Sequence, residues 1–256
     1  MKQNSELMSR GEWNEFWQNV DSCTYIRSYK FHDYILLNSI LRIIDTIHPK
    51  RMLEIGSVNS KIFYRLPRTC KDDISFFGLD PSIDALRASR TMYDNNRVFL
   101  TCGDLFSSPL SVGKFGVVAS FGLIEHYRDP QPYIRRCLDL LAPGGTLIAG
   151  YPSYRGLTGW IQRLVNPAAL EHHFSLSAAS MATEFECAGL HDINCRYFGL
   201  FNPNMIDWGK GKLRRELMYG CFAAISPMEW LARIAGIGSL PGLVSSYVMA
   251  TGRKPA

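Results

Sequence analysis

Acidic residues lie at the ends of three apolar segments in the first half of the chain. Glu54 lies in RMLEIGS, Asp80 in FFGLDPS and Asp104 in LTCGDLF. If these segments are parallel strands, their carboxyl ends share one edge of a sheet, which is the edge where such sheets bind ligands. A carboxylate at the position of Asp80 can accept hydrogen bonds from both hydroxyls of a ribose. The spacing therefore predicts a ligand crevice that contains three carboxylates.

Histidines supply the candidates for proton transfer. His126 ends a fourth apolar segment, VVASFGLIEHY, and His172 and His173 follow a fifth. An unperturbed imidazole titrates near neutral pH, which suits a general base. We predict His173, His172 and His126 as candidate catalytic residues. For Glu125 we expect a bracing or capping role.

The composition is that of a globular protein. The chain has 256 residues, 46% of them hydrophobic and 20% charged, and a net charge of +5, which does not by itself predict a nucleic-acid partner. The first twenty residues lack a signal-peptide-type apolar run, and no apolar stretch reaches about 18 residues. The seven cysteines are scattered without a C-x-x-C pair. They indicate free thiols in the cytoplasm, with no metal site.

Apolar and amphipathic segments alternate along the chain, which predicts βαβ units and a parallel sheet. The expected strands are 51–56, 74–79, 97–101, 115–120, 145–151, 192–200 and 245–252. The expected helices are 58–66, 82–93, 130–141, 176–188 and 227–236. Ser226 and Pro227 look like the N-cap and first residue of the last helix. APGG at 142–145 is expected to form a turn before the fifth strand.

Five segments, in this order and spacing, resemble the motifs of class I S-adenosylmethionine-dependent methyltransferases. LEIGSVNSK resembles the family's E-x-G-x-G-x-G loop, although Val58 and Ser60 replace its second and third glycines. FFGLDPS, LTCGDLF, FGVVASFGLIEHYRDP and LAPGGTLIAGYPS follow, with Gly116 where the family usually has Asp. The resemblance covers about residues 50–155 and is weaker over 171–190. It implies a Rossmann-like doubly wound α/β sheet of seven strands, mostly parallel with an antiparallel last strand. To this fold we add a helical cap, which we expect from the segments outside the resemblance.

The resemblance also implies a binding site for S-adenosyl-L-methionine, whose product is S-adenosyl-L-homocysteine. By this resemblance Asp80 takes the ribose hydroxyls and Asp104 the adenine amino group. The alternatives are that Asp80 caps the helix at 82–93 and that Asp104 is a solvated loop residue. The predicted cofactor residues are Glu54, Gly56, Ser57, Asp80, Pro81, Asp104, Leu105, Ser120, Phe121 and Gly122.

A dinucleotide-dependent oxidoreductase is the rival interpretation on the same fold. It needs G-x-G-x-x-G after the first strand so that backbone can approach the pyrophosphate. Val58 and Lys61 interrupt that pattern, and Glu54 and Asp104 would repel phosphates. We therefore favour methyl transfer.

The segments on either side of the resembling region are expected to surround the methyl acceptor. We predict a helical lid at 1–48, a methyltransferase core at 49–203 and 244–256, and a helical insertion at 204–243 over the acceptor site. The insertion is apolar and basic, which allows peripheral membrane contact through 210–240. The expected acceptor is a small metabolite or natural-product intermediate, methylated on oxygen or nitrogen. The alternatives are a lipid or quinone at a membrane surface and an inactive scaffold. The expected pocket residues are Tyr25, Tyr29, Tyr151 and Tyr154, with surface or core placement as the alternative.

Overall fold

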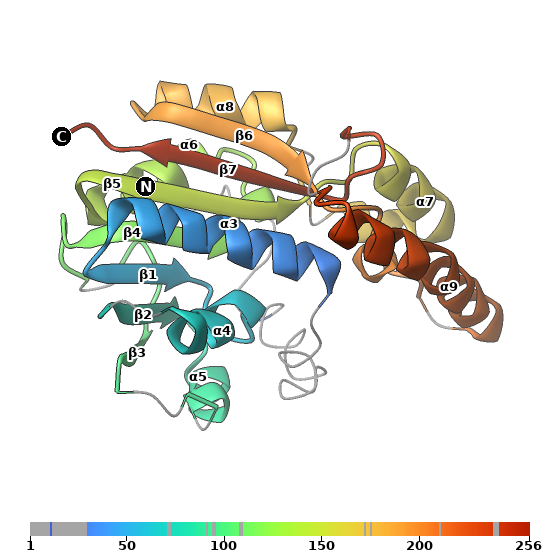
Figure 1. Cartoon of the computed structure of the whole chain (residues 1–256), viewed down its shortest axis with the longest axis horizontal. Coiled ribbons are helices and arrows are strands. Elements are labelled where there is room, and N and C mark those ends of the chain that lie inside the picture. Colours follow the sequence, from blue (N-terminus) through green and yellow to red (C-terminus); the bar gives the residue numbers. More distant parts are fainter. Residues whose placement is uncertain are drawn as a thin grey trace.

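The protein is described by a computed structural model (Figure 1). It describes residues 11, 30–70, 73–90, 92–93, 96–107, 110–171, 173–174, 176–209, 211–237 and 241–256. Tyr25, Tyr29 and His172 lie outside these residues, as does most of the predicted N-terminal lid. Within the described ranges, no helix is both long enough and apolar enough to cross a membrane.

A mixed sheet forms the centre of the molecule. Its order is β3-β2-β1-β4-β5-β7-β6, with the first five strands parallel and β7 antiparallel to both β5 and β6. The predicted fold class is confirmed. The strands are β1 (Arg51–Ile55), β2 (Ser75–Asp80), β3 (Val98–Cys102), β4 (Phe115–Phe121), β5 (Leu141–Pro152), β6 (His191–Phe198) and β7 (Tyr247–Arg253).

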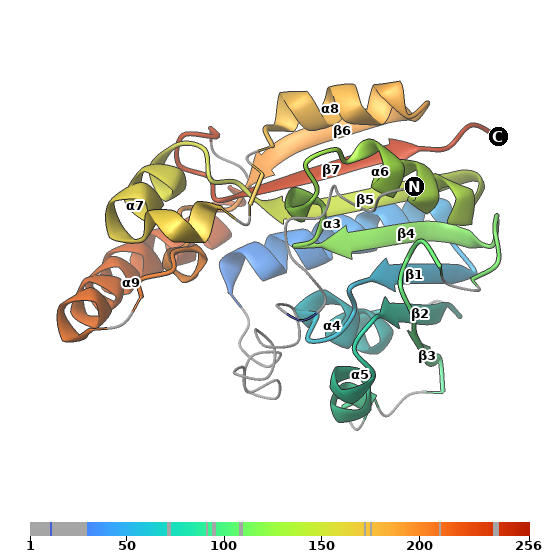
Figure 2. The same ribbon diagram turned by 180° about the vertical axis from the view of Figure 1, so that it is seen from behind.

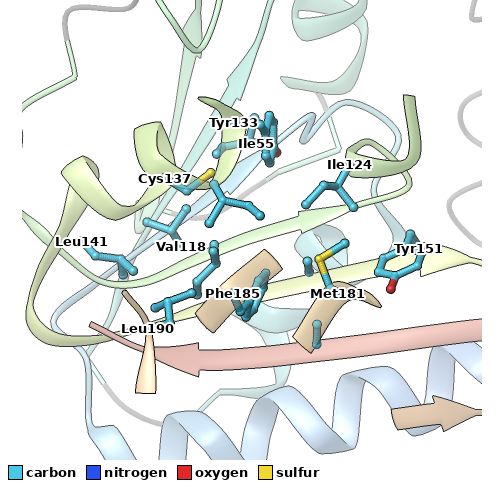
Figure 3. Close-up of a cluster of buried hydrophobic side chains, with 14 of the residues drawn as sticks. Ile55, Val118, Ile124, Tyr133, Cys137, Leu141, Tyr151, Met181, Phe185 and Leu190 are labelled. Atoms are coloured by element: carbon cyan, nitrogen blue, oxygen red, sulfur yellow. The ribbon is translucent and has the colours of Figure 1, made fainter. Parts of the chain in front are cut away.

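Helices cover both faces of the sheet because alternate strand residues point to opposite faces. In β1, Met52 packs in one hydrophobic cluster, with α3 (Phe31–Ile47) and α4 (Lys61–Thr69). Leu53 packs in the other, with α6 (Gln131–Leu140) and α8 (Ala178–Cys187). Figure 3 shows that second cluster, with Val118 of β4, Cys137 of α6 and Phe185 of α8 gathered together. The short α5 (Ile83–Arg90) follows β2.

Residues 31–47 belong to the sheet sandwich. The apolar face of α3, which includes Leu37, Ile40 and Ile44, is buried against the sheet and α4. This part of the predicted 1–48 lid is therefore a layer of the core and not a roof over the crevice.

Two helices extend the molecule beyond the carboxyl ends of the parallel strands. Figures 1 and 2 show α7 (Leu157–Val165) and α9 (Lys212–Ile234) at this end. They pack together around Phe201, Ile206 and Trp208. The described residues also contain the 3₁₀ helices η1 (Ile124–His126), η2 (Pro167–Leu170) and η3 (Pro203–Met205).

The sequence analysis placed the start of α9 wrongly. Pro227 lies inside a single helix of 23 residues, where a first-turn position was expected. The Ser226 hydroxyl donates to the Phe222 carbonyl at 2.7 Å instead of capping the helix. A half-buried seam of Met218, Cys221 and Ile225 against α7 holds the turns before the proline, and such tertiary packing outweighs the local signal for a helix start.

The expected turn at 142–145 is also wrong, because these residues open strand β5. The strand starts irregularly: the register against β4 shifts between Phe115 and Val117. The Gly144 N–H donates to the Pro255 carbonyl, and the Lys254 N–H to the Gly145 carbonyl. The C-terminal segment thus pairs with backbone groups that a turn would have left to solvent.

Candidate active site

The loop between β1 and α4 approaches the sheet edge through backbone. Gly56 has φ +73°, a left-handed conformation that glycine adopts without strain. Its N–H donates to the Leu79 carbonyl at 2.8 Å, which ties the loop to β2. Ser60, at the third family glycine position, accepts from the Phe63 N–H at 3.0 Å and so caps α4. The departure from the family pattern therefore has a local structural role.

A cavity opens at the carboxyl ends of β1, β2, β3 and β4. It brings together many of the predicted cofactor residues, which are Gly56, Asp80, Pro81, Asp104, Leu105, Phe121 and Gly122. Its wall also contains residues that were not predicted, which are Ile55, Val58, Leu79, Ser82, Gly103, Leu123, Tyr127 and Tyr133. Tyr127 follows the E-H pair directly, a signal that sequence reasoning had available and did not use.

Asp80 is fixed at the cavity wall by backbone donors. One carboxylate oxygen accepts from the Val58 N–H at 3.3 Å and the other from the Ser82 N–H at 3.0 Å. Ser82 itself accepts from the Ala85 N–H at 3.4 Å, so the serine caps α5. The carboxylate thus joins the loops after β1 and β2 while it borders the cavity.

Asp104 forms a tight turn at the same edge. Its Oδ1 accepts from the N–H groups of Phe106 and Ser107 at 2.8 and 3.2 Å. Leu105 beside it is buried, and both residues line the cavity. The turn orients one carboxylate oxygen by backbone bonds.

Glu54 lies behind the cavity wall. It is fully buried, and neither carboxyl oxygen has a hydrogen-bond partner among the described residues. Burial raises the pKa of Glu54 to about 8, an effect that the nearby Ser60 hydroxyl offsets only in part. Ser57 and Ser120, also predicted as cofactor residues, are each 1% exposed and do not line the cavity.

Unsatisfied polar groups collect beside the loop after β1. Besides Glu54, the Ser57 hydroxyl and both side-chain polar atoms of Asn59 are buried without partners in the described part of the chain. Leaving such a group unpaired costs roughly 1–3 kcal/mol. None of these three side chains lines the cavity.

Two of the predicted catalytic histidines meet in a second cluster. The rings of His126 and His173 lie 4.8 Å apart between centroids, and Tyr154 packs edge-on against His173. His126 Nε2 lies 3.8 Å from Glu125 Oε1. Burial raises the pKa of Glu125 to about 8. The cluster adjoins the cavity, because a Cβ added at Gly122 would lie 3.8 Å from Glu125 Oε1.

Tyr151 lies elsewhere. It is fully buried in the hydrophobic cluster under α8, and its hydroxyl donates to the Ser177 carbonyl at 3.3 Å. It does not line the cavity. The Tyr154 hydroxyl donates to the Met205 carbonyl at 3.2 Å, which joins the end of β5 to η3.

Residues 53–149 match a family model described as a methyltransferase domain. A protein of Mycolicibacterium smegmatis named "Probable S-adenosylmethionine-dependent methyltransferase" is 30% identical over 112 residues. That alignment covers 44% of this chain and 42% of the relative, so it spans less than half of the relative's length.

Solved structures share the fold at low identity. A Thermotoga maritima protein described as a SAM-dependent methyltransferase aligns with a TM-score of 0.61 and 17% identity, over 94% of this chain and 99% of that one. Phosphoethanolamine N-methyltransferase 2 of Haemonchus contortus, solved with S-adenosyl-L-methionine, aligns with a TM-score of 0.57 and 15% identity, over 90% and 61%. The [4+2]-cyclase SpnF aligns with a TM-score of 0.52 and 17% identity, over 86% and 83%.

Proposed function

We propose that the protein is a class I S-adenosylmethionine-dependent methyltransferase that methylates a small organic acceptor on oxygen or nitrogen. The proposal is supported by the match of residues 53–149 to a methyltransferase-domain model and by the partial similarity to a relative named as such an enzyme. S-Adenosylmethionine is the cofactor of this domain class. The observation that carries the proposal is the cavity at the carboxyl edge, where Gly56, Asp80 and Asp104 arrive from three separate strands.

Different cavity residues are proposed to bind different parts of the cofactor. In this proposal, Asp80 accepts hydrogen bonds from the two ribose hydroxyls, and Asp104 accepts from the adenine amino group with Leu105 against the ring. Gly56 lets the ligand approach backbone without a Cβ in the way. Phe121 and Gly122, at the end of β4, border the methionine end.

For methyl transfer an enzyme mainly has to hold the acceptor atom in line with the S–CH₃ bond and exclude water. When bound, S-adenosylmethionine supplies a methyl group on a positively charged sulfur. The aromatic wall of Phe121, Tyr127 and Tyr133 suits a reaction in which positive charge disappears. His126 and His173 are the described candidates for a general base, and Tyr154, in contact with His173, is the described candidate for the acceptor pocket.

A methyl-donor assay tests this function. Purified protein is incubated with S-adenosylmethionine labelled in the methyl group and with a library of hydroxyl- and amine-bearing metabolites. We expect label transfer to at least one acceptor class, with stoichiometric release of S-adenosylhomocysteine. Cofactor binding without transfer to any acceptor, lipids included, would favour the scaffold interpretation over an enzyme.

A lipid-surface acceptor is the second candidate, and the surface of α7 and α9 favours it. Both helices expose large apolar side chains, and Arg214 and Arg215 are exposed beside them. Aromatic and basic residues together are typical of helices that lie on anionic membranes. The exposed set is Trp160, Leu164, Leu213, Leu217, Tyr219, Met228, Trp230, Leu231 and Ile234.

Vesicle sedimentation separates the two acceptor classes. If α9 docks on lipid, the protein will co-sediment with vesicles that contain phosphatidylglycerol, and the double variant Leu217→Glu/Leu231→Glu will stay in the supernatant. Val112→Glu is the matched control, because Val112 is also exposed (60%) but lies before β4 at the opposite edge of the sheet. Equal sedimentation of all three proteins would argue against a lipid surface.

A further inference from the structure

Glu125, His126 and His173 form a compact group of metal-binding side chains. Glu125 and His126 lie on η1, directly after β4, and His173 follows η2. Each side chain offers one ligand atom, and these atoms all lie within 4.8 Å of one another. One carboxylate and two imidazoles are a donor set found in zinc enzymes with three protein ligands.

Burial makes this group different from a surface cluster. Glu125 is 1% exposed and His126 is 4% exposed. Glu125 Oε2 has no hydrogen-bond partner among the described residues. A buried carboxyl oxygen without a partner is costly, and a cation between the three side chains would supply the missing partner.

Backbone contacts hold the two segments in place. The Phe174 N–H donates to the Glu125 carbonyl at 2.6 Å, which ties the histidine segment to η1. His173 Nδ1 lies 2.9 Å from the Ala169 carbonyl. A carbonyl can only accept, so this contact places the ring proton on Nδ1 and the lone pair on Nε2. A hydrogen bond of this kind commonly orients a metal-binding histidine.

We propose that Glu125, His126 and His173 bind a divalent transition-metal ion, Zn²⁺ in the first instance, and that its open coordination position receives the acceptor. This differs from the sequence-based expectation of no metal. The donor set of two nitrogens and one oxygen suits zinc better than magnesium or calcium, which prefer oxygen ligands.

The location links the ion to the chemistry, and this link rests on the proposed function. The group adjoins Gly122 at the end of the cofactor cavity assigned to methionine. An acceptor hydroxyl bound to the ion has a lowered pKa and releases its proton to solvent. Its oxygen then forms the O–CH₃ bond while the S–CH₃ bond breaks and that electron pair stays on sulfur. A separate general base is not required.

Metal titration tests the proposal without any activity measurement. Chelator-treated protein is titrated with Zn²⁺ by calorimetry, and with Co²⁺ while the visible spectrum is recorded. We expect one equivalent to bind and tetrahedral-type Co²⁺ absorption to appear. Glu125→Gln and His173→Ala should each weaken Zn²⁺ binding at least tenfold. His191→Ala is the matched control, because His191 is an exposed histidine beside Asp192, on β6.

Two results would overturn the site: wild-type protein that binds no stoichiometric Zn²⁺, or variants that bind it as tightly as wild type. The isosteric Glu125→Gln keeps the test valid if His173→Ala unfolds. The same samples are titrated with S-adenosylhomocysteine. If wild-type protein binds S-adenosylhomocysteine but no metal, only the metal site is refuted. If wild-type protein does not bind S-adenosylhomocysteine, the proposed function itself is contradicted.

Discussion

Glu54 and Asp80 are carboxyl groups on neighbouring strands with opposite surroundings. Backbone N–H groups of Val58 and Ser82 donate to Asp80, whereas Glu54 is fully buried without a described partner. Burial raises the pKa of Glu54 from 4.5 to about 8, so the native protein keeps a proton there that the unfolded chain has released. Glu54 should therefore make stability depend on pH.

The stability contribution of Glu54 should decrease as pH rises. The contribution of Glu54 is fully present below pH 4.5 and is lost as pH rises through about 8. Relative to Glu54→Gln, the free energy of unfolding of wild type should fall by on the order of 1 kcal/mol per pH unit across this window. Tyr93, the titratable neighbour of Glu54, has its pKa raised by burial and stays neutral there.

Urea denaturation of cofactor-free protein at several pH values measures this difference. Exposed Glu216 provides the control, since Glu216→Gln should leave the pH profile unchanged. Parallel profiles for wild type and Glu54→Gln would show that Glu54 is already ionised in the native state.

The sequence predicted those cavity residues whose position follows from the direction of the parallel strands. Asp80 and Asp104 end parallel strands, and every such strand delivers its end to one edge. It did not separate Glu54 from them, because alternation along β1 turns that side chain into the layer under α4, away from the cavity. It missed Tyr133, which reaches the cavity from α6, because helix packing over a sheet leaves no local sequence signal.

The approach of β2 to the loop after β1 depends on Gly78. A Cβ at this position would collide with the Ser57 hydroxyl and lie 2.9 Å from Leu100 Cδ2. Gly78→Ala should therefore displace the loop, destabilise the protein by roughly 1–3 kcal/mol and weaken S-adenosylhomocysteine binding.

A double variant checks the cause. Gly78→Ala/Ser57→Gly removes the colliding side chain and should recover part of the stability and affinity. Gly220→Ala, in α9 with open space around the added methyl group, should be neutral or stabilising. If Gly78→Ala binds the nucleoside as wild type does, the loop position does not matter for the site.

The limits of helices and strands could be predicted where the apolar periodicity agreed with the residues that mark the ends of an element. Strands β1 to β4 and helix α6 fall within one or two residues of expectation, because their apolar and amphipathic patterns are local signals. The limits of α9 and β5 were missed, because distant partners decide them. Those partners are α7 for the first and the C-terminal segment for the second.

The molecule as a whole is asymmetric in a way that serves the proposed site. Five parallel strands deliver their ends to one edge, and α7 and α9 extend from that same end (Figures 1 and 2). The cofactor cavity, the group of Glu125, His126 and His173, and the exposed helices α7 and α9 thus lie on one side of the molecule. The mostly parallel sheet of seven strands with an antiparallel last strand was implied by the family resemblance, whereas the exposed side of α9 could be seen only after the helices were packed.

The central claim is that a single nucleoside binds between the acidic residues of this edge. Calorimetric titration of S-adenosylhomocysteine into wild type, Asp80→Ala and Asp84→Ala tests it most directly, since the Asp84 side chain is 91% exposed on α5, outside the cavity. We predict micromolar binding by wild type and Asp84→Ala, and a loss of about 1–3 kcal/mol, or roughly 5- to 150-fold, for Asp80→Ala. Wild-type affinity in Asp80→Ala, or no binding by any of the three, would contradict the account.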